Sequence, residues 1–326
     1  MVVAHVHSVF DLSDHFPALP YPRPLLLVGH GTRDAQGRAD FLRFAQEYAA
    51  LDPSRPVVPC FLELTEPLIA QGIATCVAAG WRDISVVPLL LLAARHLKLD
   101  ITRELDRARA QYPGLQIHYG RHLGLAPEIL ALWQERLAQV DHPTIPRSET
   151  VVLLVGRGAS DPDANSDVFK LARLLWEGSG YLTVETCFVG ITHPRLEEGW
   201  RRVWLQRPKR VIVVPHFLFT GVLVQKIQAM AQQMQAEHPE VAITCLSELG
   251  INPTLFALVR QRERETFGTD MPMNCDVCKF RQMVLNGNIH DHSHDHHHSH
   301  HHDHDHHHGY TDPYRDIQEY HRRIWR

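Results

Sequence analysis

Short apolar runs alternate with longer segments of helical periodicity along most of the chain. The first part holds several apolar runs of strand length, at residues 24–29, 56–62, within 83–92, and 115–119. Helical patterns separate these runs, at residues 35–50, 66–80 and 97–112. Apolar strands joined by helices form parallel sheets, because the helices cover both faces of the sheet. The pattern therefore predicts an α/β fold.

The sequence aligns with itself when it is shifted by 127 residues. LLLVGHGTRDAQGRADFLRFAQ aligns with VLLVGRGASDPDANSDVFKLAR, CFLELTEP with CFVGITHP, and SVVPLLLLAA with IVVPHFLFTG. With one residue of slippage, HLGLAPEIL aligns with ELGINPTLF. Blocks that recur in one order at one spacing indicate an internal duplication. We expect two similar α/β lobes with parallel sheets and a cleft between them, which makes the chain a monomer with an internal pseudo-dimer.

The duplication and a change of composition near residue 265 divide the chain into segments. These are an N-terminal extension (1–23), a first lobe that carries the active site (24–145), a second lobe (146–265) and a tail (266–326). The 326 residues, with 44% hydrophobic content, suffice for two domains with substantial cores.

Charge and composition argue against several classes of protein. A net charge of −4 gives no indication of binding to nucleic acid or to an anionic membrane. No apolar run approaches the ~20 residues that span a bilayer, and no basic region precedes the apolar N-terminal residues as in a signal peptide. The cysteines do not form the framework of a secreted disulfide-rich protein, so we expect a cytoplasmic location.

Polar side chains follow three predicted strands of the first lobe. His30 follows the first strand, Glu63 the second and His96 the third. Ligands of α/β proteins bind beyond the carboxyl ends of the strands. Two imidazoles and a carboxylate suit a divalent metal such as Co²⁺, Fe²⁺, Ni²⁺ or Zn²⁺, and they also suit base chemistry at neutral pH.

The second lobe lacks this triad. Its aligned residues are Arg157, Gly190 and Leu223. The triad is therefore not needed to build the fold, which favours a role in chemistry. The alternative for each residue is structural: a hydrogen-bonded histidine, or a glutamate paired with a nearby arginine.

Further charged or polar residues near strand ends are candidates for binding an anionic substrate. They are Arg33, Arg95, Lys98, Arg157 and His216. Arginine binds carboxylates through two parallel hydrogen bonds. Solvated surface charge is the alternative for the cations, and His216 could be structural.

The segments LLLVGHGTRD, CFLELTEP and VVPLLLLAARHLKLDI resemble those of the class II tetrapyrrole chelatases. The similarity covers roughly residues 24–265 and is greatest to the long, internally duplicated sirohydrochlorin cobaltochelatases (CbiX-like). The resemblance implies two chelatase-like lobes and insertion of a divalent metal into sirohydrochlorin, a polycarboxylate tetrapyrrole, in cobalamin and porphyrin biosynthesis. It also implies that His30 and His96 bind the metal and that Glu63 is the acidic residue of the site.

The tail carries two further motifs. Cys275 and Cys278 form a Cys-x-x-Cys pair that is suited to a metal, an Fe–S cluster or redox chemistry. Long cobaltochelatases resemble the chain here too, and their form is associated with an iron–sulfur cluster. Two cysteines cannot complete a four-cysteine cluster, so a second chain, through a dimer, or other ligands would be needed. Unoccupied exposed thiols are the alternative.

Residues 290–308 contain 13 histidines in 19 positions. Such a segment binds Co²⁺, Ni²⁺ or Zn²⁺ weakly at many sites, which suits metal storage or delivery. The alternative is a solvated linker.

The sequence thus favours a sirohydrochlorin cobaltochelatase. One alternative is a sirohydrochlorin ferrochelatase that supplies siroheme. Another is a non-catalytic metal-storage or metallochaperone protein, which would not explain the strand-end triad. A two-lobed binding protein of the periplasmic type is a third.

Overall fold

The computed structural model describes residues 16–94 and 96–268. All of them belong to one compact unit, Met1–Asn274, and the other unit, Cys275–Arg326, lies outside the described residues. The tail motifs, including Cys275 and Cys278, are therefore not described.

The first parallel sheet has the strand order β2-β1-β3-β4. Its strands are β1 (Leu25–Gly29), β2 (Val57–Phe61), β3 (Asp83–Pro88) and β4 (Gln116–Tyr119). The connecting helices are α2 (Ala35–Ala50), α3 (Ile69–Ala78), the π-helical turn η1 (His96–Ile101) and α4 (Thr102–Gln111). All strand pairs are parallel, as the alternation of apolar runs and helices predicts.

The second sheet repeats this topology with the order β6-β5-β7-β8. Its strands are β5 (Thr150–Gly156), β6 (Thr183–Phe188), β7 (Arg210–Pro215) and β8 (Ala242–Cys245). Its connections contain α6 (Pro162–Trp176), α7 (Leu196–Leu205) and α8 (Val222–Glu237), and a 3₁₀ turn, η2 (Arg147–Glu149), precedes β5. The predicted fold class, two similar parallel-sheet lobes, is confirmed.

The central strands are buried on both faces because their side chains alternate between two cores. On β1, Leu25 and Leu27 join one hydrophobic cluster, and Leu26 and Val28 join another. The second cluster is closed by α3 and α4, whose buried residues include Ile73 and Leu105 on those helices.

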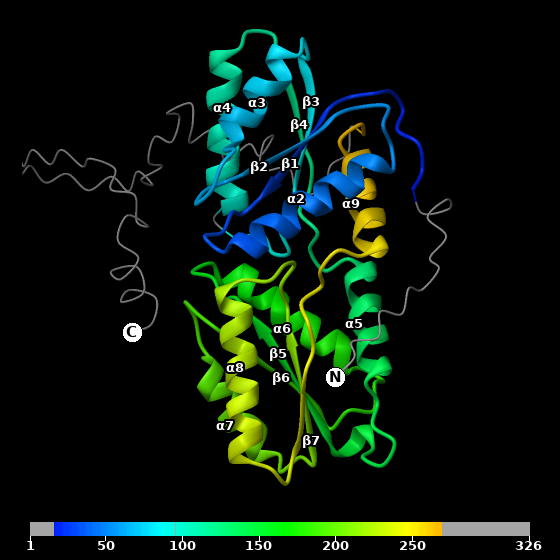
Figure 1. The fold of residues 1–326 in the computed structure, drawn as a ribbon, viewed down its shortest axis with the longest axis vertical. Coiled ribbons are helices and arrows are strands. Elements are labelled where there is room, and N and C mark those ends of the chain that lie inside the picture. The colour runs from blue at the N-terminus through cyan, green and yellow to red at the C-terminus, as the bar shows by residue number, and fades with distance from the viewer. Residues whose placement is uncertain (1–15, 95, 269–326) are drawn as a thin grey trace, which may run out of the picture. The chain divides into compact units, whose positions relative to one another are not determined.

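The last helix of the first repeat packs on the second sheet. This helix, α5 (Pro127–Gln139), contacts α6, and Figure 1 shows it beside the strands of the second sheet. Trp133 on α5 donates a hydrogen bond to His216 at the end of β7. Arg136 donates to the backbone carbonyls of Glu248 and Leu249, at 2.6 Å each.

The last helix of the second repeat makes the reciprocal contacts. This helix, α9 (Pro253–Glu265), contacts β3 and lies near α2 in Figure 1. Arg262 donates to the carbonyls of His122 and Leu123, at 2.9 and 3.0 Å. The two repeats therefore exchange their last helices.

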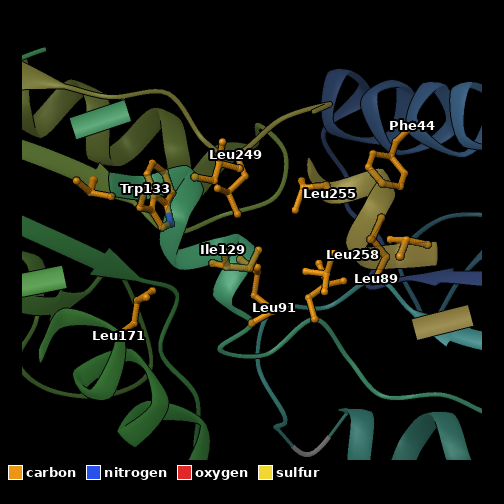
Figure 2. Packing of buried hydrophobic residues seen from close by; sticks show 14 of the residues in the cluster. Phe44, Leu89, Leu91, Ile129, Trp133, Leu171, Leu249, Leu255 and Leu258 are labelled. Carbon is orange, nitrogen blue, oxygen red and sulfur yellow. The ribbon is translucent and has the colours of Figure 1, made fainter. Parts of the chain in front are cut away.

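The exchanged helices join the two sheets through one hydrophobic cluster. It contains Leu27 of β1 and Val152 of β5, together with Ile129 of α5 and Leu255 of α9. Figure 2 shows Ile129 and Trp133 on one of these helices, and the other helix packed near Phe44 of α2. Pulling the sheets apart would expose this shared core.

The cysteines of the described residues are free thiols. Cys60, Cys76 and Cys187 are buried, and Cys245 is half-buried. Among the described residues, no helix combines the length and the apolar character needed to cross a membrane.

Candidate functional site

The loop after β1 packs directly on the loop after β2. The backbone N–H of Leu62 donates to the backbone carbonyl oxygen of Gly29 at 2.9 Å, and that of Glu63 donates to the backbone carbonyl oxygen of His30 at 3.2 Å. Gly31 has a φ of +97°, and a Cβ there would lie 1.8 Å from the carbonyl oxygen of Glu63. Only glycine fits this left-handed, crowded position. The glycine thus brings the two strand-end loops, with His30 and Glu63, into contact.

The His30 and Glu63 side chains point toward one another. Nε2 of His30 lies 3.8 Å from Oε1 of Glu63, and both side chains are partly exposed. A metal bond to imidazole nitrogen or carboxylate oxygen is ~2.1 Å long. A separation of 3.8 Å is short enough for one ion to contact both atoms.

Arg157, the counterpart of His30 in the second repeat, reaches this pair. It follows β5, and its Nη1 lies 2.8 Å from Nε2 of His30. Because a guanidinium only donates, His30 accepts at Nε2, and its Nδ1 carries the proton and lies 3.2 Å from the carbonyl oxygen of Gly31. The sequence picked out Arg157 as a substrate-binding residue but did not foresee this contact.

Partial burial affects the pKa of Arg157. Its side chain keeps contact with solvent, yet neighbouring atoms remove enough water to lower the pKa of its guanidinium, and the Glu63 carboxylate opposes this shift. Arginine remains protonated at any ordinary pH. A permanent positive charge therefore faces both His30 and Glu63.

The remaining member of the predicted triad is only partly described. His96 begins the π-helical turn η1, which follows β3, so its backbone lies after the third strand of the sheet. Its side chain and the whole of Arg95 lie outside the described residues. Among the described residues, no group of three or more His, Cys, Asp or Glu side chains could hold a metal ion.

Lys98 is engaged by carboxylates of the second repeat. Its Nζ lies 2.8 Å from Oδ2 of Asp161 and 2.9 Å from Oδ2 of Asp163. Burial lowers the pKa of Lys98, but the two hydrogen-bonded carboxylates outweigh that effect and raise it overall. The predicted substrate contact would have to compete with both aspartates. No pattern in the sequence predicted this pairing.

The contact of Lys98 has a weaker counterpart. Gln225 on α8 aligns with Lys98, and its Nε2 lies 3.4 Å from Oδ2 of Asp34, the N-cap of α2.

Arg33, which precedes this cap, is exposed. Its side chain is therefore accessible to an anion, as a substrate-binding residue must be.

His216 lies inside the protein. It is 3% exposed, and its Nδ1 accepts a hydrogen bond of 3.1 Å from Nε1 of Trp133. Burial lowers the pKa of His216 to about 4, so the ring is neutral at pH 7. This burial argues against the predicted direct contact with a substrate.

Comparison with known proteins identifies the scaffold. The CbiX family model matches residues 24–140 and 151–266, which are the two repeats. The chain belongs to the CbiX family. The duplication inferred from the sequence is thus two copies of the CbiX unit in one chain.

Two curated relatives of this family member differ in their metal. A sirohydrochlorin cobaltochelatase of Priestia megaterium is 40% identical over 263 residues, which are 80% of this chain and 85% of the relative. A sirohydrochlorin ferrochelatase of Bacillus subtilis is 35% identical over 243 residues, which are 74% of this chain and 91% of the relative.

A solved structure of the family shows the same fold. The sirohydrochlorin chelatase SirB from Bacillus subtilis subspecies spizizenii, in complex with cobalt, matches with a TM-score of 0.63 and 32% identity. The match covers 75% of this chain and 95% of SirB.

Proposed function

We propose that this CbiX-family chain is a sirohydrochlorin chelatase that inserts Co²⁺ into the tetrapyrrole. The observation that carries the proposal is the pair His30–Glu63, held 3.8 Å apart after neighbouring parallel strands. The resemblance to a cobaltochelatase at 40% identity favours cobalt. The ferrochelatase relative keeps Fe²⁺ as the second candidate metal.

The chemistry follows from the state of the two side chains. His30 presents an acceptor nitrogen, Nε2, to the site, as a ligand to a divalent ion must. Glu63 supplies a carboxylate for the ion or for a proton. Insertion of the metal releases two pyrrole protons, and a neutral imidazole or a carboxylate can accept them. A metal that must be passed on calls for few protein ligands, which a two- or three-ligand site satisfies.

Other parts of the proposal rest on the sequence. His96 is proposed as a further metal ligand, and Arg33, Arg95 and Arg157 as partners for substrate carboxylates. A metal or Fe–S role for Cys275 and Cys278, a dimer through the tail, and a cytoplasmic location remain predictions.

The test is anaerobic absorbance of the full-length protein with sirohydrochlorin and either Co²⁺ or Fe²⁺. We expect rapid metallation by the wild type. The rate should fall by at least about 100-fold in His30→Ala and in Glu63→Gln, since each removes a group that binds the ion or accepts a proton. His238→Ala, at the half-exposed C-cap of α8, is the control and should keep the wild-type rate. A wild-type rate equal to that of the protein-free reaction would contradict the proposal.

The metal-storage alternative is tested by deleting the tail. The deletion should start at residue 269, because Thr266 is buried and accepts hydrogen bonds from Arg23 at 2.9 and 3.0 Å. A chelatase keeps its rate at saturating metal, whereas a storage protein loses most of its metal capacity.

A further inference from the structure

The Arg157 guanidinium occupies the position that a metal ion bound to His30 would take. Its Nη1 lies 2.8 Å from Nε2 of His30. The negative charge of the Glu63 carboxylate favours the protonated guanidinium. One cation from the second repeat thus faces both side chains that are proposed to receive the metal.

The two cations cannot use His30 at the same time. A neutral imidazole has a single in-plane lone pair, on the nitrogen that carries no proton. A metal on Nε2 would lie ~2.1 Å away along that lone pair, where it would collide with a hydrogen-bond donor at 2.8 Å. Binding of a divalent ion at His30 therefore requires Arg157 to leave.

We propose that Arg157 is a placeholder for the substrate metal. The proposal rests on the function of His30 as a metal ligand. The guanidinium holds His30 in the tautomer with an acceptor Nε2 and balances the charge of Glu63, so the ligands stay assembled before the ion arrives. The arriving ion displaces it. Arg157 is thus a positioning residue for metal entry.

The surroundings of Arg157 allow this exchange. Its side chain is exposed to solvent, so water can take up the guanidinium when it leaves His30. Once displaced, the guanidinium is a bidentate donor without its imidazole partner, suited to a carboxylate of the tetrapyrrole. Arrival of the metal would then prepare a contact for the second substrate.

A purely structural role for the Arg157–His30 bond leads to the opposite expectation. If the bond only held the two repeats together, its removal would loosen the site and weaken metal binding or leave it unchanged. If Arg157 competes with the metal, its removal tightens metal binding, because both the competing donor and a like charge are lost.

The test is a Co²⁺ titration of full-length protein under anaerobic conditions, for wild type, Arg157→Ala, Arg157→Lys and His30→Ala. All variants keep the histidine-rich tail, so its binding cancels when the His30→Ala titration is subtracted. Arg43→Ala, which removes one charge from an exposed position on α2, is the control. Urea unfolding shows whether each variant is folded.

We expect the His30-dependent site to bind Co²⁺ about tenfold more tightly in Arg157→Ala, as loss of one competing charged hydrogen bond implies. Arg157→Lys keeps the positive charge without the planar guanidinium, so its affinity for Co²⁺ should lie between those of Arg157→Ala and the wild type. Unchanged or weaker binding in Arg157→Ala, with the site lost in His30→Ala, overturns the placeholder role and leaves the proposed function intact. Identical titrations of the wild type and His30→Ala would mean that no His30-dependent site exists, and the proposed function itself would fail.

Discussion

The two repeats share a backbone and differ in the chemistry that they place on it. After the first strand, one repeat presents His30 and the other Arg157, and after the second strand one presents Glu63 and the other Gly190. Gly31 follows His30 and Gly158 follows Arg157, and both glycines have a positive φ. The shared loop geometry therefore belongs to the scaffold, whereas the side chains at these positions were free to change.

A second difference lies under the exchanged helices. Glu263 of α9 is fully buried and accepts hydrogen bonds from Arg55 at 2.6 and 2.7 Å and from Tyr48 at 2.5 Å. The aligned residues of the other repeat are leucines, namely Leu137, Leu175 and Leu182. One docking position is thus ionic and the other apolar. A buried ion pair is weak evidence for extra stability, because desolvation offsets its attraction.

The largest expected effect comes from breaking the ionic position. Glu263→Ala leaves Arg55 buried without its carboxylate, which we expect to lower the free energy of unfolding by about 3–5 kcal/mol. Urea unfolding measures it. The triple variant Tyr48→Leu, Arg55→Leu and Glu263→Leu places the leucines of the other repeat at these three positions and should be more stable than Glu263→Ala. Arg260, a further donor to Glu263, keeps Asp52 as a partner. A triple variant as unstable as the single one would show that the three leucines are stable only in the surroundings that the other repeat provides.

The next effect concerns His216, whose counterpart in the first repeat is the buried Leu89. Burial lowers the pKa of His216 to about 4, below its value of ~6.5 in the unfolded chain. The unfolded state therefore binds the proton first, and stability is lost as pH falls from ~6.5 to about 4.

His216→Leu should remove this contribution, of at most about 1.4 kcal/mol per pH unit. At pH 7 the variant should itself be less stable by about 1–3 kcal/mol, because Nε1 of Trp133 loses its acceptor. Unfolding curves recorded from pH 7 to pH 4 make the comparison, and His142→Leu, a change of an exposed histidine, is the control. Parallel pH profiles for wild type and His216→Leu would contradict the expectation.

The smallest expected effect on stability concerns the two aligned polar contacts between the repeats, made by Lys98 and by Gln225. Lys98→Ala removes an amine shared by Asp161 and Asp163, and we expect a loss of about 0.5–1 kcal/mol that shrinks at high salt. Gln225→Ala removes one hydrogen bond of 3.4 Å to Asp34, so its smaller loss should not depend on salt. Urea midpoints at low and high salt measure both variants. Equal salt dependence would show that charge does not distinguish the two contacts.

The sequence predicted the parts of the structure that depend on local pattern. The apolar runs located the strands, and the 127-residue spacing predicted the repeated topology. The rule that ligands gather beyond parallel strands anticipated that His30 and Glu63 would meet. These features follow from short segments whose own residues determine them.

Contacts between distant segments could not be predicted in this way. The apolar faces of α5 and α9 would suit either sheet, so periodicity does not reveal which sheet each helix covers. The pairing of Arg157 with His30, and of Lys98 with Asp161, depends on how the repeats dock. Burial of His216 depends on Trp133, which the exchange brings to it.

The helix exchange also bears on the order in which the protein is completed during synthesis. The second sheet and its covering helix, α5, come from one continuous stretch between Pro127 and Cys245. The first sheet needs α9, which ends at Glu265, more than a hundred residues after β4. Domains generally fold as units, the N-terminal one first. Here the half of the molecule that leaves the ribosome first should be the last to acquire its full core.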